Sequence, residues 1–376
     1  MNFDFPDDVK DMRDEAKRFL AAKCPPGVPR KILDHGGSYD KSLWSEIGAM
    51  GWLGCTVPEA YGGSGLGHLA TCALAEEVGY AIAPTPFAST VYLGIEALLL
   101  FASEAQKRAH LPKLAAGEAI ATFAVAEQAG PFVIDRIKTR HADGRLTGTK
   151  LAVADGDVAD LAIVVAQDTR RGPILALVDL SGTGVKRETV PTVDPTRSHA
   201  NITFDGARCE ILDGAKGATD IRRLIDRAAI MMAFEQVGGA QAALDMATGY
   251  AKERYAFGRP IGSFQAIKHK LADMYVAIEL ARSNAYYGAW ALNSNAAELP
   301  VAAAVARIAA NDAGWLATKE NVQTHGGMGF TWEGDAHLYY RRAKLLGVAL
   351  GGSSEWKRRL MGEIKARNAP GLAHAD

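Results

Sequence analysis

The spacing of apolar residues changes twice along this chain, and this change constrains the fold more than any single motif does. Apolar side chains in the first part recur at the spacing of one helix face. Between residues 122 and 204, short runs rich in β-branched residues replace this spacing, separated by Asp-Gly, Ser-Gly and Pro signals. Long helical segments then return. Helices are expected at residues 7–22, 42–50, 69–79, 92–101, 104–114, 221–254, 263–293, 301–323 and 335–365.

This order predicts an α+β fold in three parts. We expect a helical N-terminal domain over residues 1–118, a middle β domain over residues 119–212 and a C-terminal four-helix bundle over residues 213–376. A chain of 376 residues is long enough for two or three packed units. Helices are not expected between residues 161 and 204, where the β-branched runs lie.

Composition narrows the classes of function. Lys and Arg together number 42 against 43 for Asp and Glu, so no overall charge favours nucleic acid or an anionic membrane. The first residues lack a basic segment followed by an apolar run, and no stretch reaches the length of a membrane span. Four cysteines are scattered without the spacing of a metal site. We therefore expect a cytoplasmic protein with reduced thiols, no metal and no membrane span.

Two segments of the C-terminal part carry residues suited to a phosphorylated cofactor. Arg254 lies at the expected end of a helix, and Phe257-Gly258 follow it. A guanidinium can bind a diphosphate through two parallel hydrogen bonds, and an aromatic ring can contact a base. Some seventy residues later, Gly326-Gly327 lacks two Cβ atoms, which lets backbone approach a ligand closely.

These segments resemble the flavin-binding part of the acyl-CoA dehydrogenase family. The resemblance extends over the whole chain through Gly51-Trp-Leu-Gly, Val57-Pro-Glu-Ala-Tyr-Gly-Gly and Ile137-Lys-Thr139. It implies FAD-dependent α,β-dehydrogenation of an acyl-CoA thioester in lipid metabolism, with electrons passed to an electron-transferring flavoprotein. It also implies an oligomer, a homotetramer or a mixed tetramer with a paralogous subunit, in which FAD lies across a subunit boundary.

The resemblance assigns cofactor contacts to particular residues. Arg254 and Phe257 would contact the diphosphate and adenosine end of FAD. Gln265 and Gln323 would hydrogen-bond its polar groups, and Gly326-Gly327 would let the backbone approach it. The alternative interpretations are solvated helix surface for the two glutamines and a helix C-cap for the glycine pair.

The chain departs from the family in the β domain. Ala126 and Phe132 stand where the family has a Thr and a Ser that hold flavin and pantetheine atoms. Ala152 stands where a Trp covers the flavin ring. A ring-stacking surface and two hydroxyl groups are therefore missing.

The base that removes the α-proton is also missing from its usual places. Leu350 occupies the position of the catalytic Glu in many members, and Ala228 occupies the second known position. Glu235 lies on the same apolar helix stripe as Ala228, so we expect it as the catalytic residue if the chain is active alone. The alternative for Glu235 is a structural carboxylate paired with an Arg across the bundle. The neighbouring Gly238-Gly239 pair suggests room for a ligand.

Two further functions stay open at this point. Without a base, the chain resembles a non-catalytic or half-site subunit of a mixed acyl-CoA dehydrogenase tetramer. A protein that binds CoA or flavin without turnover is the third alternative. Flavin content of the purified chain, with or without a paralogous partner, distinguishes the first two functions, and acyl-CoA binding without flavin or turnover indicates the third.

Overall fold

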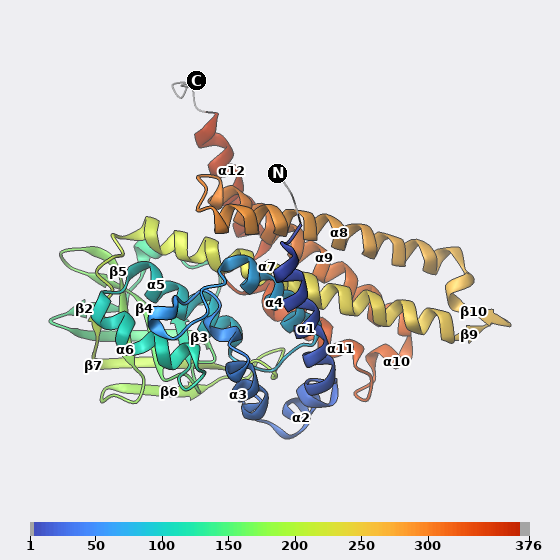
Figure 1. The fold of residues 1–376 in the computed structure, drawn as a ribbon, viewed down its shortest axis with the longest axis horizontal. Coiled ribbons are helices and arrows are strands. Elements are labelled where there is room, and N and C mark those ends of the chain that lie inside the picture. Colours follow the sequence, from blue (N-terminus) through green and yellow to red (C-terminus); the bar gives the residue numbers. More distant parts are fainter. Residues whose placement is uncertain (1–3, 369–376) are drawn as a thin grey trace. The chain divides into compact units, whose positions relative to one another are not determined.

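Helices and strands follow one another in the predicted order in the computed structural model, which describes residues 4–368 (Figure 1). The predicted α+β fold is confirmed, with helical N- and C-terminal parts and a β-sheet formed by the middle of the chain. The chain divides into two compact units. Unit 1 comprises residues 4–10, 75–82 and 229–368, and unit 2 comprises residues 11–74 and 83–228.

The N-terminal helices begin at residues that can cap them. Asp40 accepts a hydrogen bond from the Leu43 amide at 2.9 Å at the start of α3, and Ser103 and Gln106 form a capping box at the start of α6. A buried π-helix occupies Ala88–Ile95, which begins four residues before the helix predicted at residues 92–101 and overlaps its start. The helices are α1 Asp7–Lys23, α2 Gly27–His35, α3 Lys41–Ala49, α4 His68–Tyr80, α5 Glu96–Phe101 and α6 Glu104–Ala115.

The sheet of unit 2 is mostly antiparallel. Its order is β6-β7-β3-β2-β4-β5-β8, and β1 pairs with β4 in parallel. The β4–β5 hairpin carries the two runs of buried aliphatic residues that the sequence marks as strands. The strands are β1 Ala121–Ala124, β2 Arg140–Ala142, β3 Arg145–Ala154, β4 Leu161–Asp168, β5 Gly172–Asp179, β6 Val185–Thr189, β7 His199–Arg208 and β8 Glu210–Ile211.

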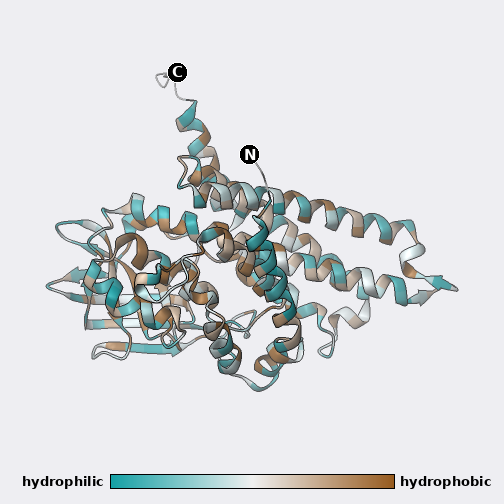
Figure 2. Ribbon diagram, viewed as in Figure 1, coloured by the Kyte–Doolittle hydropathy of each residue, from teal (hydrophilic) through white to brown (hydrophobic). Residues whose placement is uncertain are grey.

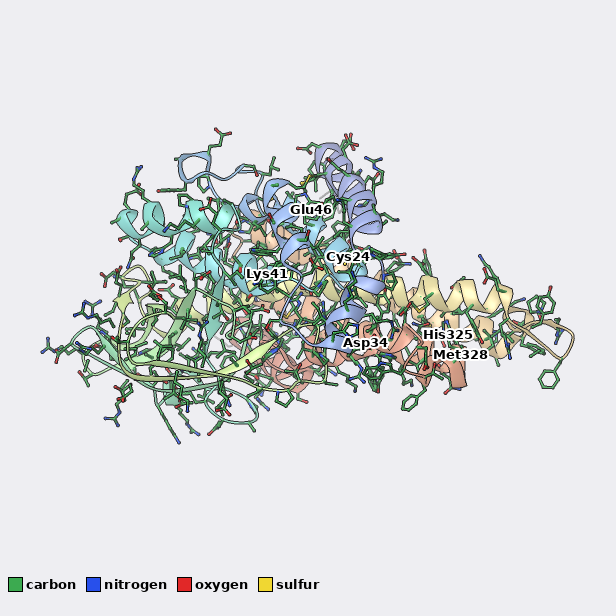
Figure 3. The ribbon with its side chains drawn as sticks, turned by 90° about the horizontal axis from the view of Figure 1, so that it is seen from below. Cys24, Asp34, Lys41, Glu46, His325 and Met328 are labelled. Carbon is green, nitrogen blue, oxygen red and sulfur yellow. The ribbon has the colours of Figure 1, made fainter. Side chains whose placement is uncertain are left out.

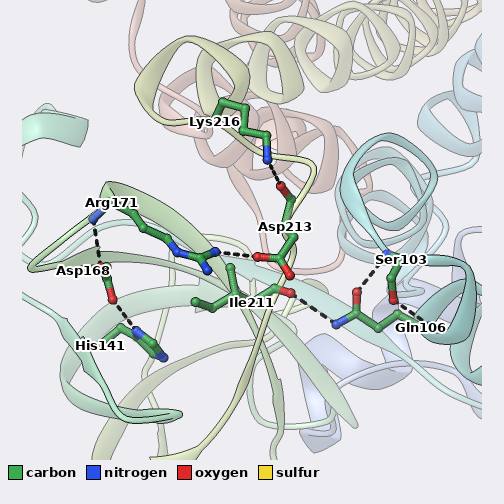
Figure 4. A network of polar contacts seen from close by, with 8 residues as sticks. All are labelled: Ser103, Gln106, His141, Asp168, Arg171, Ile211, Asp213 and Lys216. Carbon is green, nitrogen blue, oxygen red and sulfur yellow. Dashed lines mark hydrogen bonds and ion pairs between the residues drawn. The ribbon is translucent and has the colours of Figure 1, made fainter.

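Polar side chains fix the last strand of this sheet and the segment after it (Figure 4). Gln106 donates to the carbonyl oxygen of Ile211 at 3.3 Å, which ties α6 to β8. At the far end of β4, Asp168 lies 2.7 Å from the ring of His141. Because His141 stabilises the ionised carboxylate, the pKa of Asp168 falls to about 2.

Long helices form most of unit 1, and residues 218–228 of the first of them, α7, belong to unit 2. The helices are α7 Ala218–Glu253, α8 Gln265–Asn293, α9 Leu299–His325, α10 Gly327–Phe330, α11 Ala336–Val348 and α12 Ser353–Arg367. Buried alanines line α9, which lets neighbouring helices approach closely. Hydrophilic and hydrophobic residues alternate along α8, as expected of a helix with one exposed face (Figure 2).

One predicted helix is wrong. The sequence predicts a single helix over residues 335–365, but α11 ends at Val348 and α12 begins at Ser353. The intervening turn has positive φ at Leu350 (57°) and Gly351 (103°). Contacts from α9, described below, stabilise this break. Helix α2 was also missed by the sequence analysis, because its short apolar pattern lies between two prolines and a Gly-Gly pair.

Gly238 on α7 and Gly79 on α4 serve helix packing. A Cβ built on Gly238 would come within 1.8 Å of the carbonyl oxygen of Glu76, and one on Gly79 within 1.9 Å of that of Glu235. The last turns of α4 therefore cross α7 in backbone contact. At Gly238, the room that the sequence suggested for a ligand is filled by α4.

Candidate functional site

The predicted cofactor residues lie at one end of the helices of unit 1. Near this end, the ring of Tyr250 on α7 stacks on His325 of α9 with centroids 4.2 Å apart. Lys270 on α8 binds Glu320 on α9 at 2.8 Å. The end of α7, the start of α8 and the end of α9 are thus neighbours. Figure 3 labels His325 and Met328 in this region.

A tight hairpin connects α7 to α8 at this end. Strand β9 (Tyr255–Ala256) pairs with β10 (Arg259–Pro260), and the two turn residues are Phe257 (φ 53°) and Gly258 (φ 78°). Positive φ at both positions is the geometry of a type I′ turn. An aromatic residue rarely adopts it. The turn leaves the Phe257 side chain 95% exposed.

The other predicted contacts are exposed in the same region. Arg254, Gln265, Gln323, Gly326 and Gly327 are all exposed. Gly326 has φ 59° and ψ −135°, a conformation that glycine adopts readily. A Cβ on Gly327 would meet no atom of the described residues within 4 Å, so its own chain does not require glycine there. A guanidinium, two amides and open backbone form a donor set that fits the diphosphate of FAD.

The β domain offers few cofactor-binding groups around the positions at which the chain departs from the family. Glu127, next to Ala126, accepts hydrogen bonds from Lys150 (2.8 Å) and from the hydroxyl of Thr139 (2.6 Å). Burial lowers the pKa of Lys150 to about 8. Glu127 therefore holds the Ile137-Lys-Thr139 segment against β3, which is a structural role. Ala126 and Phe132 supply no hydroxyl and Ala152 supplies no aromatic ring, so this part contributes few groups to a flavin.

Glu235 lies inside the bundle. Its side chain is 0% exposed, and its Oε1 lies 3.7 Å from a guanidinium nitrogen of Arg342 on α11. The charge of Glu235 also stabilises buried Arg307, whose pKa burial lowers to about 9. Together with Tyr339, Thr318 and Gly239, Glu235 and Arg342 line a cavity of about 10 Å³, roughly the room for one water.

Buried polar groups hold the turn between α11 and α12. The guanidinium of Arg307 on α9 donates to the carbonyl oxygens of Leu346 and, at 2.8 Å, of Ala349. Asn311 donates to the hydroxyl of Ser353 at 3.2 Å on the other side of the turn. Leu350, at the position where the resemblance implies a catalytic Glu, is therefore held from both sides in an unusual backbone conformation.

Sequence reasoning passed over one carboxylate beside this turn. Glu355 lies on the first turn of α12, and a Cβ on Gly351 would come within 2.8 Å of its Oε2. This oxygen is buried and makes no hydrogen bond with any of residues 4–368. Burial raises the pKa of Glu355 above its ordinary value, although the charges of Arg359 and Arg358 act in the other direction. The sequence offered one signal for a role of Glu355, namely its position five residues after Leu350.

Within residues 4–368, no group of three or more His, Cys, Asp or Glu side chains could hold a metal ion. Over the same range, none of the helices combines the length and the apolar character that a membrane crossing requires. All four cysteines are free thiols, and Cys209 alone is partly exposed.

Comparison with known proteins gives matches at both ends of the chain. Residues 6–118 match the family model described as acyl-CoA dehydrogenase, N-terminal domain. Residues 215–365 match the model described as acyl-CoA dehydrogenase, C-terminal domain. Acyl-CoA dehydrogenase IpdE2 of Mycobacterium tuberculosis is 34% identical over 364 residues, which cover 96% of this chain and 98% of the relative.

Solved structures share the fold over nearly the full length. The ChsE4-ChsE5 complex from Mycobacterium tuberculosis matches with a TM-score of 0.89 and 28% identity, covering 98% of this chain and 100% of the other. A chain in a structure titled electron transferring flavoprotein of Acidaminococcus fermentans matches with a TM-score of 0.89 and 26% identity. That match covers 97% of this chain and 99% of the other.

Proposed function

This chain belongs to the acyl-CoA dehydrogenase family, and we propose that it takes part in FAD-dependent α,β-dehydrogenation of an acyl-CoA thioester. Members of the family bind FAD. The observation that carries the proposal is the group of exposed polar and glycine residues at one end of α7, α8 and α9. When bound, FAD accepts the hydride that leaves Cβ of the acyl chain, which no amino-acid side chain can do.

The residues of this chain bind and orient the cofactor. Arg254 holds the diphosphate through its planar fork of donors, and the exposed ring of Phe257 contacts the adenosine end. Gln265 and Gln323 donate or accept at the remaining polar groups. Gly326 and Gly327 let the backbone approach, which explains glycine at a position where its own chain leaves open space.

The outward-facing cofactor residues also bear on the assembly and on the electron acceptor. Because these residues face outward, a second subunit can enclose the cofactor in an oligomer. We infer that electrons then pass to an electron-transferring flavoprotein. The likeness to a chain in the solved structure described as electron transferring flavoprotein of Acidaminococcus fermentans supports this partner.

The test begins with the wild-type protein purified alone. We expect flavin absorbance and about one FAD per chain, together with reduction of an artificial electron acceptor when acyl-CoA thioesters of different lengths are added. A colourless protein that binds no acyl-CoA contradicts the proposal. Acyl-CoA or flavin binding without reduction of the acceptor identifies instead a protein that binds these ligands without turnover.

A second function is favoured by the absence of an acid at Leu350 and Ala228. In this case the chain is a non-catalytic or half-site subunit of a mixed tetramer, and a paralogous subunit supplies the missing carboxylate. The likeness to a structure titled as a complex of two differently named chains supports it. Coexpression with paralogues encoded nearby should then yield a flavin-containing complex whose activity exceeds that of either chain alone.

A further inference from the structure

Three side chains hold the turn at residues 349–352 by hydrogen bonds to the turn or to the residues next to it. Arg307 binds carbonyl oxygens before it, Asn311 binds Ser353 after it, and Trp356 donates to the carbonyl oxygen of Gly351 at 3.1 Å. Leu350 keeps φ at 57°, which costs free energy in a residue with a branched side chain. Such conformations persist where the surroundings impose them, and they concentrate at functional sites.

Glu355 places a carboxylate on this turn. Gly351 has no Cβ, and the space that a Cβ would fill lies 2.8 Å from Glu355 Oε2. The oxygen is shielded from solvent and has no hydrogen-bond partner among residues 4–368. Glu355 is only half-buried as a whole, so the group can exchange a proton with a ligand or solvent. Burial also raises its pKa, which makes the carboxylate a stronger base.

We propose that Glu355 is the base that removes the α-proton, in place of the acid missing at position 350. This inference rests on the proposed function. The carboxylate of Glu355 takes the proton from Cα and becomes a carboxylic acid. The electron pair of the Cα–H bond would then form the Cα=Cβ double bond, and bound FAD would accept the hydride that leaves Cβ. Arg307 and Asn311 are positioning residues that keep the turn, and with it Glu355, in one place.

The alternative base, Glu235, has a different environment. It is fully buried inside the bundle, and its Oε1 lies 3.7 Å from the guanidinium of Arg342. No ion pair within 4.0 Å is found for Glu355 in the described part of the chain. Of the two carboxylates, Glu355 therefore combines partial exposure with a raised pKa.

The test compares Glu355→Gln with Glu363→Gln, a matched change two turns further along α12. Two rates are measured with a straight-chain acyl-CoA. They are dehydrogenation with an artificial acceptor and exchange of the Cα hydrogen for solvent deuterium, followed by mass spectrometry. We expect Glu355→Gln to lower both at least 100-fold with unchanged FAD content and acyl-CoA affinity. Glu363→Gln should match the wild type.

A rescue experiment separates a base from a structural carboxylate. Adding Leu350→Glu to the Glu355→Gln variant places a carboxylate on the same turn, and should restore deuterium exchange at least tenfold. Equal rates for the Glu355 and Glu363 variants overturn the proposal. So does a wild type that binds FAD and acyl-CoA but shows neither rate, a result that favours the mixed tetramer. A wild type that binds neither ligand contradicts the proposed function itself.

Discussion

The carboxylate of Glu235 and the guanidinium of Arg342 form a buried pair that joins α7 to α11, with 3.7 Å between Oε1 and Nη1. Replacing Glu235 with Gln leaves Arg342 and nearby Arg307 without that negative charge inside the bundle. We expect the free energy of unfolding to fall by about 3 kcal/mol. Chemical denaturation measures it. The control is Glu279→Gln, which breaks a more exposed pair with Arg282 and should cost less than about 1 kcal/mol.

The same variant tests the catalytic role predicted for Glu235 from the sequence. If Glu235 were the base, Glu235→Gln would lower dehydrogenation by several orders of magnitude under conditions in which the variant is fully folded. Turnover per folded, FAD-containing chain is the measurement. Near-normal turnover together with lower stability leaves Glu235 a structural role alone.

Alanine substitutions at two neighbouring glycines of α7 should change stability in opposite directions. Gly238→Ala places a methyl group within 1.8 Å of a backbone oxygen of α4, so we expect a loss of about 3 kcal/mol of stability. At Gly239 the nearest such atom is 3.5 Å away, an ordinary contact. Alanine there gains helix propensity and should change stability by up to about 1 kcal/mol in the favourable direction. Equal effects of the two changes would show that the helix crossing is looser than described.

Arg254 should be required for retention of the cofactor. Arg254→Ala removes the fork of donors and should lower FAD occupancy at least tenfold without loss of helical content. Arg254→Lys restores the charge but not the fork, so occupancy should recover only in part. Arg108→Ala, which removes another exposed arginine, serves as the control. Unchanged FAD content in Arg254→Ala would rule out the diphosphate contact.

The protein should form a dimer of dimers. Tyr275, Val276 and Leu280 on α8 are 56%, 54% and 60% exposed, and exposed apolar side chains close together mark contact surfaces. We expect Leu280→Asp to yield smaller species in sedimentation, whereas Leu66→Asp, at a leucine in unit 2 that is 55% exposed, should leave the oligomer intact. A wild type that sediments as a monomer at micromolar concentration would contradict this prediction and weaken the FAD assignment.

The fold was predictable because local periodicity and packing agree over most of the chain. Residues 7–22 and 221–254 carry helical spacing, and the structure forms α1 and α7 there within three residues at each end. The break at residues 349–352 was missed although Gly351-Gly352 is a local turn signal. The groups that stabilise the break, Arg307 and Asn311, come from about 40 residues earlier in the sequence.

The candidate site was predictable only where a motif lies within one segment. The Arg254–Phe257 hairpin and the Gly326-Gly327 pair each occupy a few consecutive residues, so sequence alone could single them out. The environment of a carboxylate depends instead on groups distant in sequence. Arg342, which pairs with Glu235, lies on another helix, and the burial that raises the pKa of Glu355 is created by the tertiary fold.

The pH dependence of turnover should report Glu355. A base acts in its ionised form, so the maximal rate should rise with pH through the pKa of Glu355, which burial places above the ordinary 4.5. The charge of Arg359 lowers this pKa, and Arg359→Gln should therefore move the inflection to higher pH. Arg367→Gln, near the end of the same helix, should leave the inflection in place. Identical profiles for the Arg359 and Arg367 variants would show that another group controls the rate, because a titrating Glu355 must respond to the nearer charge.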